Sequence, residues 1–330
     1  MTMNDVSDHI GVSIATISRV LNNSGIVKPK TREKVMNGIR ELDFVPSSLG
    51  RNLRTTGTKT FLICVQSIEN PYYAEIVRSI EEEAKKRGYY IMICESYSSL
   101  KRYKYFADAV KSKKADGIIL LSPNAKDAIE YFREAPFVVC GETDGTFDCD
   151  TVNIDNEKAA CEAVEHLIRA GAKRVAFMGG DSKSALQRFA GYEKALREAN
   201  LPSDETLRLS NLFSYDEGYA AVSRLAESGA AFDGIFAGTD ILAVSAVNAL
   251  IAQGKRVPED VKVVGFDDLV FAKMCAVPIT TIRQPRKAMG AAAFNLLYEK
   301  AVRKTDDKNK ARDSQRIVLE HELIVRSSSK

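Results

Sequence analysis

The feature that most restricts the fold is an alternation of short apolar runs with longer amphipathic stretches. The apolar runs are Phe61–Val65, Tyr90–Cys94, Gly117–Leu121, Phe137–Cys140, Val175–Phe177, Gly234–Ala237 and Val261–Phe266. Such runs, separated by stretches of helix length, are typical of parallel sheets covered by helices on both faces. The plan occurs twice, in residues 61–158 and 159–280, so we expect two Rossmann-like lobes. Ligands of such sheets bind beyond the carboxyl ends of the strands, and two facing lobes form a cleft there.

The first 45 residues follow a different plan, that of three short helices. The first helix is predicted over residues 4–10 and is followed by Gly11, a residue that leaves a helix without steric cost. Ser13 is predicted to cap a second helix, which buries Ile17, Val20 and Leu21. A third helix is predicted from Thr31, as its cap, to about Leu42. Two helices joined by a tight turn are the layout of a helix-turn-helix unit.

The second helix leaves a small, polar face outward, and this face suits the major groove of DNA. Arg19 can pair with guanine or phosphate, and Ile14 or Ala15 can touch a thymine methyl group. Ser18 and Asn22 lie on the same face. A three-helix bundle without a DNA-binding role remains the alternative interpretation of this spacing.

Charge and the following linker favour DNA binding. Residues 1–59 hold nine Lys or Arg against five Asp or Glu, whereas the rest of the chain is nearly neutral. Residues 46–59 are basic and carry too little apolar surface to fold alone. Two such segments could fold together on DNA and push Leu49 or Leu53 into the minor groove. A plain interdomain linker is the alternative.

These motifs together resemble the lactose-repressor (LacI-type) family of bacterial transcriptional regulators. The resemblance rests on the string G-V-S-x-A-T-x-S-R-V-L-N from Gly11 to Asn22, on the Pro46 to Leu53 hinge, and on motifs of the body. It implies a small all-α helix-turn-helix headpiece and an α/β, periplasmic-binding-protein-like body of two Rossmann-like lobes. The implied domains are residues 1–45 (headpiece), 46–59 (hinge helix and linker) and 60–330 (effector binding and dimerisation). The implied lobes are residues 60–158 with 283–313, and residues 159–282 with 314–330.

The resemblance also assigns DNA-binding roles. It implies that Ile14 and Ala15 read bases, that Arg19 holds a base or a phosphate, and that Leu53 is the minor-groove lever. The phosphate-holding residues that it implies are Ser13, Thr16, Ser18 and Asn22, and the hinge residues are Ser47, Arg51 and Leu53. Two positions depart from the family, because Ser47 and Gly50 stand where its members usually have Asn and Ala. Glycine lowers helix stability by about 1 kcal/mol relative to alanine.

Polar and aromatic residues follow the predicted strands of the body and indicate a ligand site. Aromatic rings, one arginine fork, hydroxyl groups and a carboxylate are what a polar ring ligand needs. The candidate residues are Tyr72, Tyr73, Ser122, Ser184, Arg188, Phe213, Thr239 and Asp267. Each also has a simpler interpretation, such as helix-start packing for the tyrosines, a surface ion pair for Arg188 and a turn residue for Asp267.

The family resemblance gives these residues roles in an effector cleft. It implies that Arg188 clamps the ligand and that Asp267 accepts a hydrogen bond from a hydroxyl or a ring N–H. Tyr72, Tyr73 and Phe213 are implied as walls, and Ser184 and Thr239 as hydroxyl partners. The first lobe departs from the family in two places. Gly141-Glu142 stands where many members have Asp, and Ser122 leaves little polarity at the end of the third predicted strand.

Other classes of function receive little support from the sequence. The three histidines are far apart, the six cysteines show no C-x-x-C spacing, and no glycine-rich nucleotide fingerprint is present. We therefore expect no metal, no cofactor and no enzymatic activity. No apolar run approaches the roughly 18 residues that cross a bilayer, and no leader peptide is evident, so we expect a cytosolic protein.

The most direct interpretation is a dimeric, sequence-specific transcriptional regulator, in the first instance a repressor. A small molecule in the cleft, with a sugar or sugar derivative as the first choice and a purine as another, would change its affinity for a palindromic DNA operator. A homodimer is expected because no leucine heptad follows Arg326. The alternatives are control by a protein corepressor, such as a phosphorylated carrier, and a sugar-binding receptor of the periplasmic type.

Overall fold

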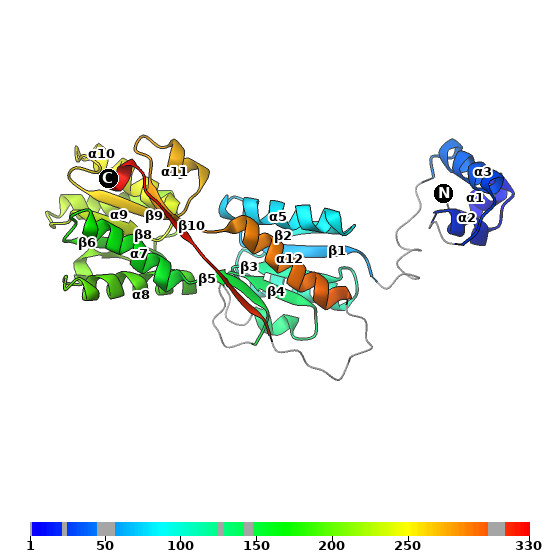
Figure 1. Cartoon of the computed structure of the whole chain (residues 1–330), viewed down its shortest axis with the longest axis horizontal. Helices are drawn as coiled ribbons and strands as arrows, with labels where there is room; N and C mark the ends of the chain where they lie inside the picture. Colours follow the sequence, from blue (N-terminus) through cyan, green and yellow to red (C-terminus); the bar gives the residue numbers. More distant parts are fainter. Residues whose placement is uncertain (1, 22–24, 45–56, 124–127, 142–147, 303–313) are drawn as a thin grey trace. The chain divides into compact units, whose positions relative to one another are not determined.

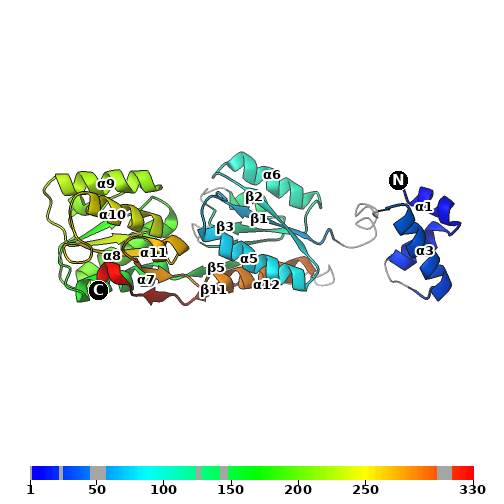
Figure 2. The same cartoon turned by 90° about the horizontal axis from the view of Figure 1, so that it is seen from above.

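The computed structural model describes residues 2–21, 25–44, 57–123, 128–141, 148–302 and 314–330. The chain forms two compact units, Met1–Thr58 and Lys59–Lys330. Figures 1 and 2 show both units from two directions. Among the helices that the structure describes, none is long and apolar enough to span a membrane.

The amino-terminal unit contains three helices: α1 (Met3–Ile10), α2 (Ile14–Leu21) and α3 (Pro29–Glu41). Thr2 and Asp5 form a reciprocal capping box at the start of α1, and Gly11 ends this helix with a φ of 65°. The Ser13 hydroxyl accepts a hydrogen bond from the backbone N–H of Thr16 at 3.4 Å, as expected for a cap of α2. Val6, Ile17, Val20 and Val35 form the buried centre of this unit.

The predicted start of the third helix is wrong by three residues. Thr31 was expected to cap this helix, but α3 already begins at Pro29. Proline is well suited to the first turn of a helix, because its fixed φ is helical and its missing N–H is not needed there. Thr31 therefore lies inside the helix.

The second unit contains two sheets of six strands each. The first sheet has the order β11-β5-β4-β3-β1-β2, and all its strands are parallel. Its strands are β1 (Thr60–Val65), β2 (Tyr90–Glu95), β3 (Gly117–Leu121), β4 (Phe137–Cys140), β5 (Thr151–Ile154) and β11 (Arg316–Leu319). Helices α5 (Tyr72–Lys86) and α12 (Arg286–Val302) cover one face, and α6 (Leu100–Lys111) with the 3₁₀ turn Ile129–Phe132 covers the other. Successive residues of β1 show why the run is apolar throughout, since Ile63 packs on one face and Cys64 on the other.

The second sheet has the order β12-β10-β9-β8-β6-β7, with only β12 antiparallel to its neighbour. Its strands are β6 (Val175–Met178), β7 (Arg208–Leu209), β8 (Gly234–Ala237), β9 (Lys262–Asp267), β10 (Thr280–Arg283) and β12 (Glu322–Ile324). Its helices are α7 (Asn156–Arg169), α8 (Lys183–Glu198), α9 (Tyr215–Glu227), α10 (Asp240–Ala252) and α11 (Val270–Met274), with short 3₁₀ turns at Glu205–Leu207 and Ser327–Ser329. Residues of α7 and α8 pack on one face and residues of α9 and α10 on the other.

The chain passes between the two sheets after β5, after β10 and after β11. These crossings move the lobe boundaries away from those expected. Residues 314–330 were assigned to the second lobe, yet β11 pairs with β5 in the first sheet, and only β12 joins the second. In the same way, all of α7 packs in the second lobe, although the expected boundary at residue 158 divides it. The two-lobe α/β architecture itself is confirmed.

Close packing of α12 on α5 yields a first testable prediction. A Cβ at Gly290 would lie 2.5 Å from the backbone oxygen of Ile76 and 2.8 Å from the Cβ of Ser79. Gly290→Ala should therefore lower the free energy of unfolding by about 1–3 kcal/mol, because the backbone of α5 must move. Ala288→Ser, which also adds one atom but on the exposed side of α12, is the control. Equal thermal midpoints for the two variants would contradict the close approach.

Candidate functional site

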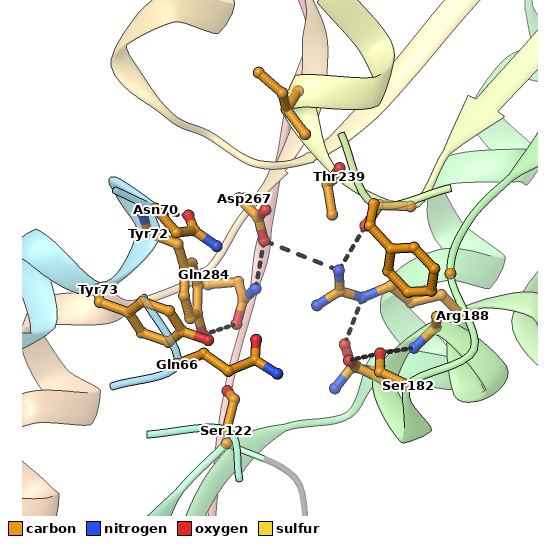
Figure 3. A pocket seen from close by; sticks show the side chains of 18 of the residues that line it. Gln66, Asn70, Tyr72, Tyr73, Ser122, Ser182, Arg188, Thr239, Asp267 and Gln284 are labelled. Atoms are coloured by element: carbon orange, nitrogen blue, oxygen red, sulfur yellow. Dashed lines mark hydrogen bonds and ion pairs between the residues drawn. The ribbon is translucent and has the colours of Figure 1, made fainter. Parts of the chain in front are cut away.

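A cavity of about 900 Å³ lies between the two lobes of the second unit, beyond the carboxyl ends of β1, β3, β6 and β9. The structure brings all eight residues proposed from the sequence to its wall: Tyr72, Tyr73, Ser122, Ser184, Arg188, Phe213, Thr239 and Asp267. Figure 3 shows tyrosines of the first lobe on one side, with Arg188 and Thr239 of the second lobe opposite them. A volume of this size is typical of sites for small ligands.

The aromatic walls come from both lobes. Tyr72 and Tyr73 begin α5, and their rings meet edge to face with centroids 5.3 Å apart. Burial raises the pKa of both phenols well above the usual 10.0, so both remain neutral hydrogen-bonding groups at physiological pH. On the other lobe the Phe213 side chain is 60% exposed and lies against Gly180, where a Cβ would be 2.8 Å from the ring. The first-lobe rings are thus fixed, and the second-lobe ring is open to a ligand.

Arg188 is held rigidly at the cavity wall rather than in a surface ion pair. It lies on α8, which begins with the Ser182 hydroxyl accepting a hydrogen bond from the N–H of Ala185. The Nε of Arg188 donates to Oδ1 of Asn156 at 2.8 Å, and Nη1 donates to the backbone oxygen of Gly238 at 2.5 Å. The guanidinium also lies 3.7 Å from the ring centroid of Phe266. These contacts pre-orient the fork, which lowers the entropic cost of binding a ligand.

Asp267 faces this guanidinium from the end of β9. Its Oδ1 lies 4.0 Å from Nη1 of Arg188, and both side chains are buried. The same oxygen accepts a hydrogen bond from Nε2 of Gln284 at 2.7 Å. A donor fork and a carboxylate side by side can bind neighbouring hydroxyl groups of one ligand.

Among the polar residues that were not proposed from the sequence, Gln284 and Asn156 contact Asp267 and Arg188 directly. Gln284 joins the two lobes, since its Oε1 accepts from the Tyr72 hydroxyl at 3.0 Å while its Nε2 donates to Asp267. Gln284 follows β10 and Asn156 follows β5, so the rule that ligands bind beyond strand ends would have found them. Both strands contain polar residues, so hydropathy does not identify them as strands. Other lining residues outside the sequence-based set include Gln66, Asn70, Asn153, Ser182 and Lys183.

Asp240 supports the site without lining it. Burial, followed by the nearby charge of Asp267, raises the pKa of this carboxyl well above its usual 3.8. Asp240 accepts hydrogen bonds of 2.6 Å from the N–H of Leu269 and from the hydroxyl of Thr281. These bonds hold the loop that follows β9, and with it the backbone of Asp267.

The residues proposed for DNA binding lie on α2 or directly before it, as far as the structure describes them. Ser13, Ile14, Ala15 and Arg19 are exposed, and Thr16 and Ser18 are half-buried. The hydroxyls of Ser13 and Thr16 lie 3.0 Å apart. Asn22, Ser47, Arg51 and Leu53 lie outside the described residues. The exposed face of α2 therefore combines small side chains with one arginine, a composition suited to base edges and phosphates.

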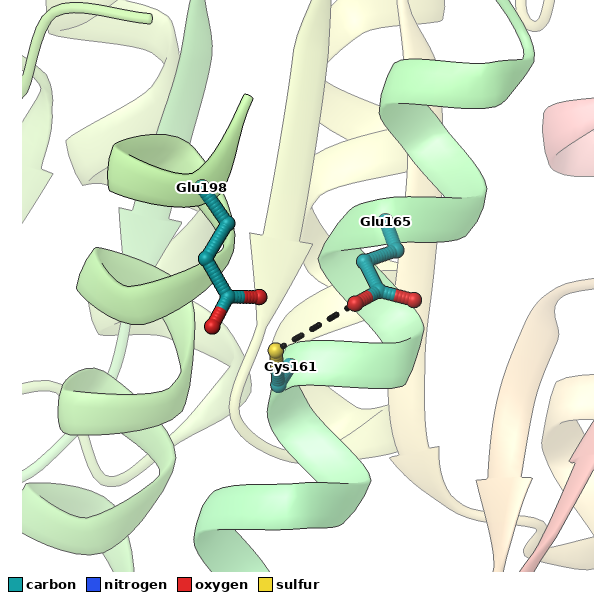
Figure 4. A group of neighbouring side chains, drawn as sticks. All are labelled: Cys161, Glu165 and Glu198. Carbon is teal, nitrogen blue, oxygen red and sulfur yellow. Dashed lines mark hydrogen bonds between the residues drawn. The ribbon is translucent and has the colours of Figure 1, made fainter. Parts of the chain in front are cut away.

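A second group of polar side chains lies away from the cavity, between α7 and α8. Ligand atoms of Cys161, Glu165 and Glu198 lie within 4.8 Å of one another (Figure 4). The thiol of Cys161 donates to Glu165 at 3.6 Å, and burial raises the pKa of this thiol to about 11. Because metal ions bind the thiolate, the raised pKa disfavours a metal here. The hydrogen bond joins residues one helical turn apart on α7, and Glu198 comes from α8.

Comparison with known proteins agrees with this arrangement. Residues 2–47 match the family model of bacterial regulatory proteins, lacI family, and residues 164–329 match that of the periplasmic binding protein-like domain. The chain is 36% identical over 337 residues to the HTH-type transcriptional regulator DegA of Bacillus subtilis (strain 168), covering 99% of this chain and 98% of DegA.

Two solved structures are similar over the whole length. The complex of the transcriptional regulator CelR with cellobiose has a TM-score of 0.74 and 31% sequence identity, covering 99% of each chain. The Lac repressor dimer bound to operator and the anti-inducer ONPF has a TM-score of 0.87 at 24% identity, covering 100% of this chain and 99% of the repressor. The second likeness establishes the shared fold.

Proposed function

Since this chain belongs to the lacI family of bacterial regulatory proteins, we propose that it is a repressor whose operator affinity is set by a carbohydrate bound between its two lobes. DNA-binding transcriptional regulation is the activity of the family. The palindromic operator, the carbohydrate and the repressing sense of the response are the parts proposed here. A regulator of this kind acts in the cytoplasm.

The facing pair Arg188 and Asp267 is the observation that carries the carbohydrate proposal. A sugar ring presents neighbouring hydroxyls that both donate and accept, and a guanidinium beside a carboxylate offers the complementary groups. Apolar faces of sugar rings pack on aromatic side chains, and Tyr72, Tyr73 and Phe213 supply such surfaces on opposite sides of the cavity. The similar regulator CelR binds cellobiose, which supports the same class of ligand here.

Ligand binding would act on DNA through the angle between the lobes. The cavity is lined from both lobes, so a ligand that contacts both favours one interlobe arrangement over others. We expect that arrangement to change the spacing of the two hinge segments of a dimer, and hence operator affinity.

Exposed apolar side chains support a homodimer of the body. On β2, at the edge of the first sheet, Tyr90 and Met92 are 76% and 59% exposed. On α11 of the second lobe, Val270 and Met274 are 63% and 78% exposed. Burying such groups against a second copy would be favourable, and a two-fold dimer would present two headpieces to a palindromic site.

The first test is selection of bound duplexes from a random pool at near-physiological salt, because phosphate contacts alone give sequence-blind binding that fades as salt rises. A recovered palindrome supports a dimeric regulator and supplies the DNA duplex with which operator affinity is measured. Mono- and disaccharides, cellobiose among them, are then screened for a change in operator affinity. A palindrome without any sugar response would contradict the carbohydrate proposal and favour a protein corepressor. Absence of any selected motif, with or without cell extract, would contradict operator binding.

Leu53→Ala is expected to weaken operator binding by about tenfold or more, because a leucine wedge in the minor groove stabilises the bent duplex. Sugar binding should be unchanged. Fluorescence anisotropy on the selected operator and calorimetry with the sugar measure the two affinities. Leu49→Ala serves as the matched comparison, since either leucine could be the wedge. If both variants keep wild-type operator affinity, the minor-groove role of this segment is wrong.

A further inference from the structure

Arg286 occupies the second crossing between the lobes and is almost completely buried, with 8% exposure. It is the first residue of α12, directly after Gln284 and Pro285. Its Nε and Nη2 both lie 2.8 Å from Oε2 of Glu75. On its other side Nη1 donates to the backbone oxygen of Asp267, and Nη2 donates to that of Asp268 at 3.1 Å. The guanidinium therefore bridges one carboxylate and two carbonyl groups.

The partners of Arg286 belong to different lobes. Glu75 lies on α5 of the first lobe, and the two carbonyls lie at the end of β9 in the second. Within the first lobe α5 and α12 are joined further by the hydroxyl of Ser79, which donates to the backbone oxygen of Lys287 at 2.6 Å. A rotation that separates α5 from the end of β9 must therefore break either the Glu75 contact or the carbonyl contacts.

The two carbonyls belong to a strained segment. Asp267 has a φ of 115° and Asp268 a φ of 54°, conformations that residues other than glycine rarely adopt. Such a backbone conformation persists only where the surroundings of the residue impose it. The hydrogen bonds from Arg286 are among the contacts that impose it. The orientation of the Asp267 carboxylate in the cavity thus depends on a guanidinium whose other partner is in the opposite lobe.

We propose that the Glu75–Arg286 pair is a positioning pair that couples the interlobe arrangement to the orientation of Asp267. The proposal rests on the proposed function in that Asp267 is taken as a ligand contact. Glu75 is 40% exposed, whereas Arg286 is 9% exposed as a side chain, so the Glu75 contact is the one that water can replace. In one arrangement of the lobes the pair is closed, and Arg286 is fixed between Glu75 and the two carbonyls. In another the pair is open, and only the carbonyl contacts are left to orient the backbone of Asp267. The state of the pair therefore depends both on the arrangement of the lobes and on the position of Asp267.

Glu75 is the residue at which this coupling can be tested without touching the ligand site. The parallel link Tyr72–Gln284–Asp267 also joins the lobes, but its members line the cavity. Glu75 and Arg286 are not among the residues of the cavity wall as far as the structure describes it. Removing the Glu75 carboxylate leaves Arg286 with both carbonyl partners. A loss of fold is therefore not expected.

The test uses the full chain with spin labels on unnatural amino acids at Glu81 of α5 and Arg197 of α8, both exposed and in different lobes. Labelled chains are diluted with unlabelled chains, so that distances within one chain dominate. Glu75→Ala should shift or broaden the interlobe distance distribution, and Glu75→Gln should have a smaller effect. Glu82→Ala, which removes the partner of Arg78 at 3.9 Å on the same helix, is the matched control and should leave the distribution unchanged.

Two further readouts separate positioning from stability and from the proposed function. Thermal midpoints must show that the Glu75 and Glu82 variants are folded at the temperature of the measurement, and Glu75→Ala should change operator affinity by about fivefold or more. A Glu75→Ala distance distribution that superimposes on the wild-type one would overturn the proposal, as would altered distances with unchanged operator affinity. A wild-type protein that selects no operator would contradict the proposed function, and the distances would still decide whether the pair sets the lobe arrangement.

Discussion

Arg188→Ala is expected to abolish the response to the carbohydrate while leaving operator affinity within about twofold of wild type, because the headpiece is a separate unit. The guanidinium is buried and stacked on Phe266, and it faces the carboxylate of Asp267 across 4.0 Å. Hydrogen bonds to a charged group contribute about 1.5–3 kcal/mol each, so loss of the fork should weaken sugar binding by about 100-fold.

Operator affinity with and without sugar measures this response, and calorimetry measures the sugar affinity. Arg188→Lys keeps the charge but loses the planar fork, so it should bind sugar only slightly better than the alanine variant. Arg197→Ala, which removes an exposed arginine from the same helix, is the control and should respond like wild type. Because Arg188 also holds Asn156 and Gly238, thermal midpoints must show that the variant is folded. A folded Arg188→Ala protein that still responds to the sugar would show that the cavity assignment is wrong.

Asp268→Asn should lower the free energy of unfolding at neutral pH by about 3 kcal/mol, because it leaves the largely buried guanidinium of Arg326 without its carboxylate partner. The Asp268 side chain is 3% exposed and accepts hydrogen bonds from Arg283 at 2.7 Å and from Arg326. Asparagine preserves the shape and tolerates the φ of 54° at this position, so the substitution isolates the charge.

Chemical denaturation of the wild-type protein and of Asp268→Asn gives the difference in their free energies of unfolding. Asp260→Asn is the control, since its pair with Arg256 is exposed and should contribute little. A loss no larger than that of the control would contradict the structural role of Asp268.

The Asp268 carboxylate should make the free energy of unfolding depend on pH in the acidic range. Burial alone would raise the pKa of Asp268, but the hydrogen bonds and charges of Arg326 and Arg283 outweigh it and hold the pKa below its usual 3.8. A group whose pKa is depressed by folding stabilises the protein above its unfolded-state pKa, and this contribution is lost as the pH falls through the folded-state value. The stability difference between wild type and Asp268→Asn should therefore be constant above about pH 5 and shrink below about pH 4.

Long apolar runs were the part of the fold that could be predicted well. Strands such as β1 and β3 are buried on both faces, so nearly every residue in them is apolar. The strands β5 and β10 were missed because their sequences, TVNI and TTIR, contain polar residues. In the structure Thr280 and Thr281 are fully buried, and their hydroxyls are hydrogen-bonded to the backbone of Arg326 and to Asp240. Hydropathy alone does not reveal a polar side chain whose partner comes from a distant segment.

The candidate site was predictable only in part, for the same reason. Residues after recognised strands, such as Tyr72, Arg188 and Asp267, could be proposed because carboxyl ends of parallel strands meet at one edge. Gln284 and Asn156 follow the missed strands. The family resemblance supplied roles for individual residues, but not the contacts that hold them.

What the sequence by itself determined was local: the capped helices of the headpiece, the alternation of strand and helix, and the kinds of side chain at each strand end. These follow from periodicity and capping, which act over a few neighbouring residues. The tertiary structure alone decided that β11 pairs with β5 and that Arg286 joins Glu75 to the backbone of Asp267. Partners about 160 to 210 residues apart meet only when the whole chain has folded, because the free energy that unites them comes from packing and burial rather than from local preference.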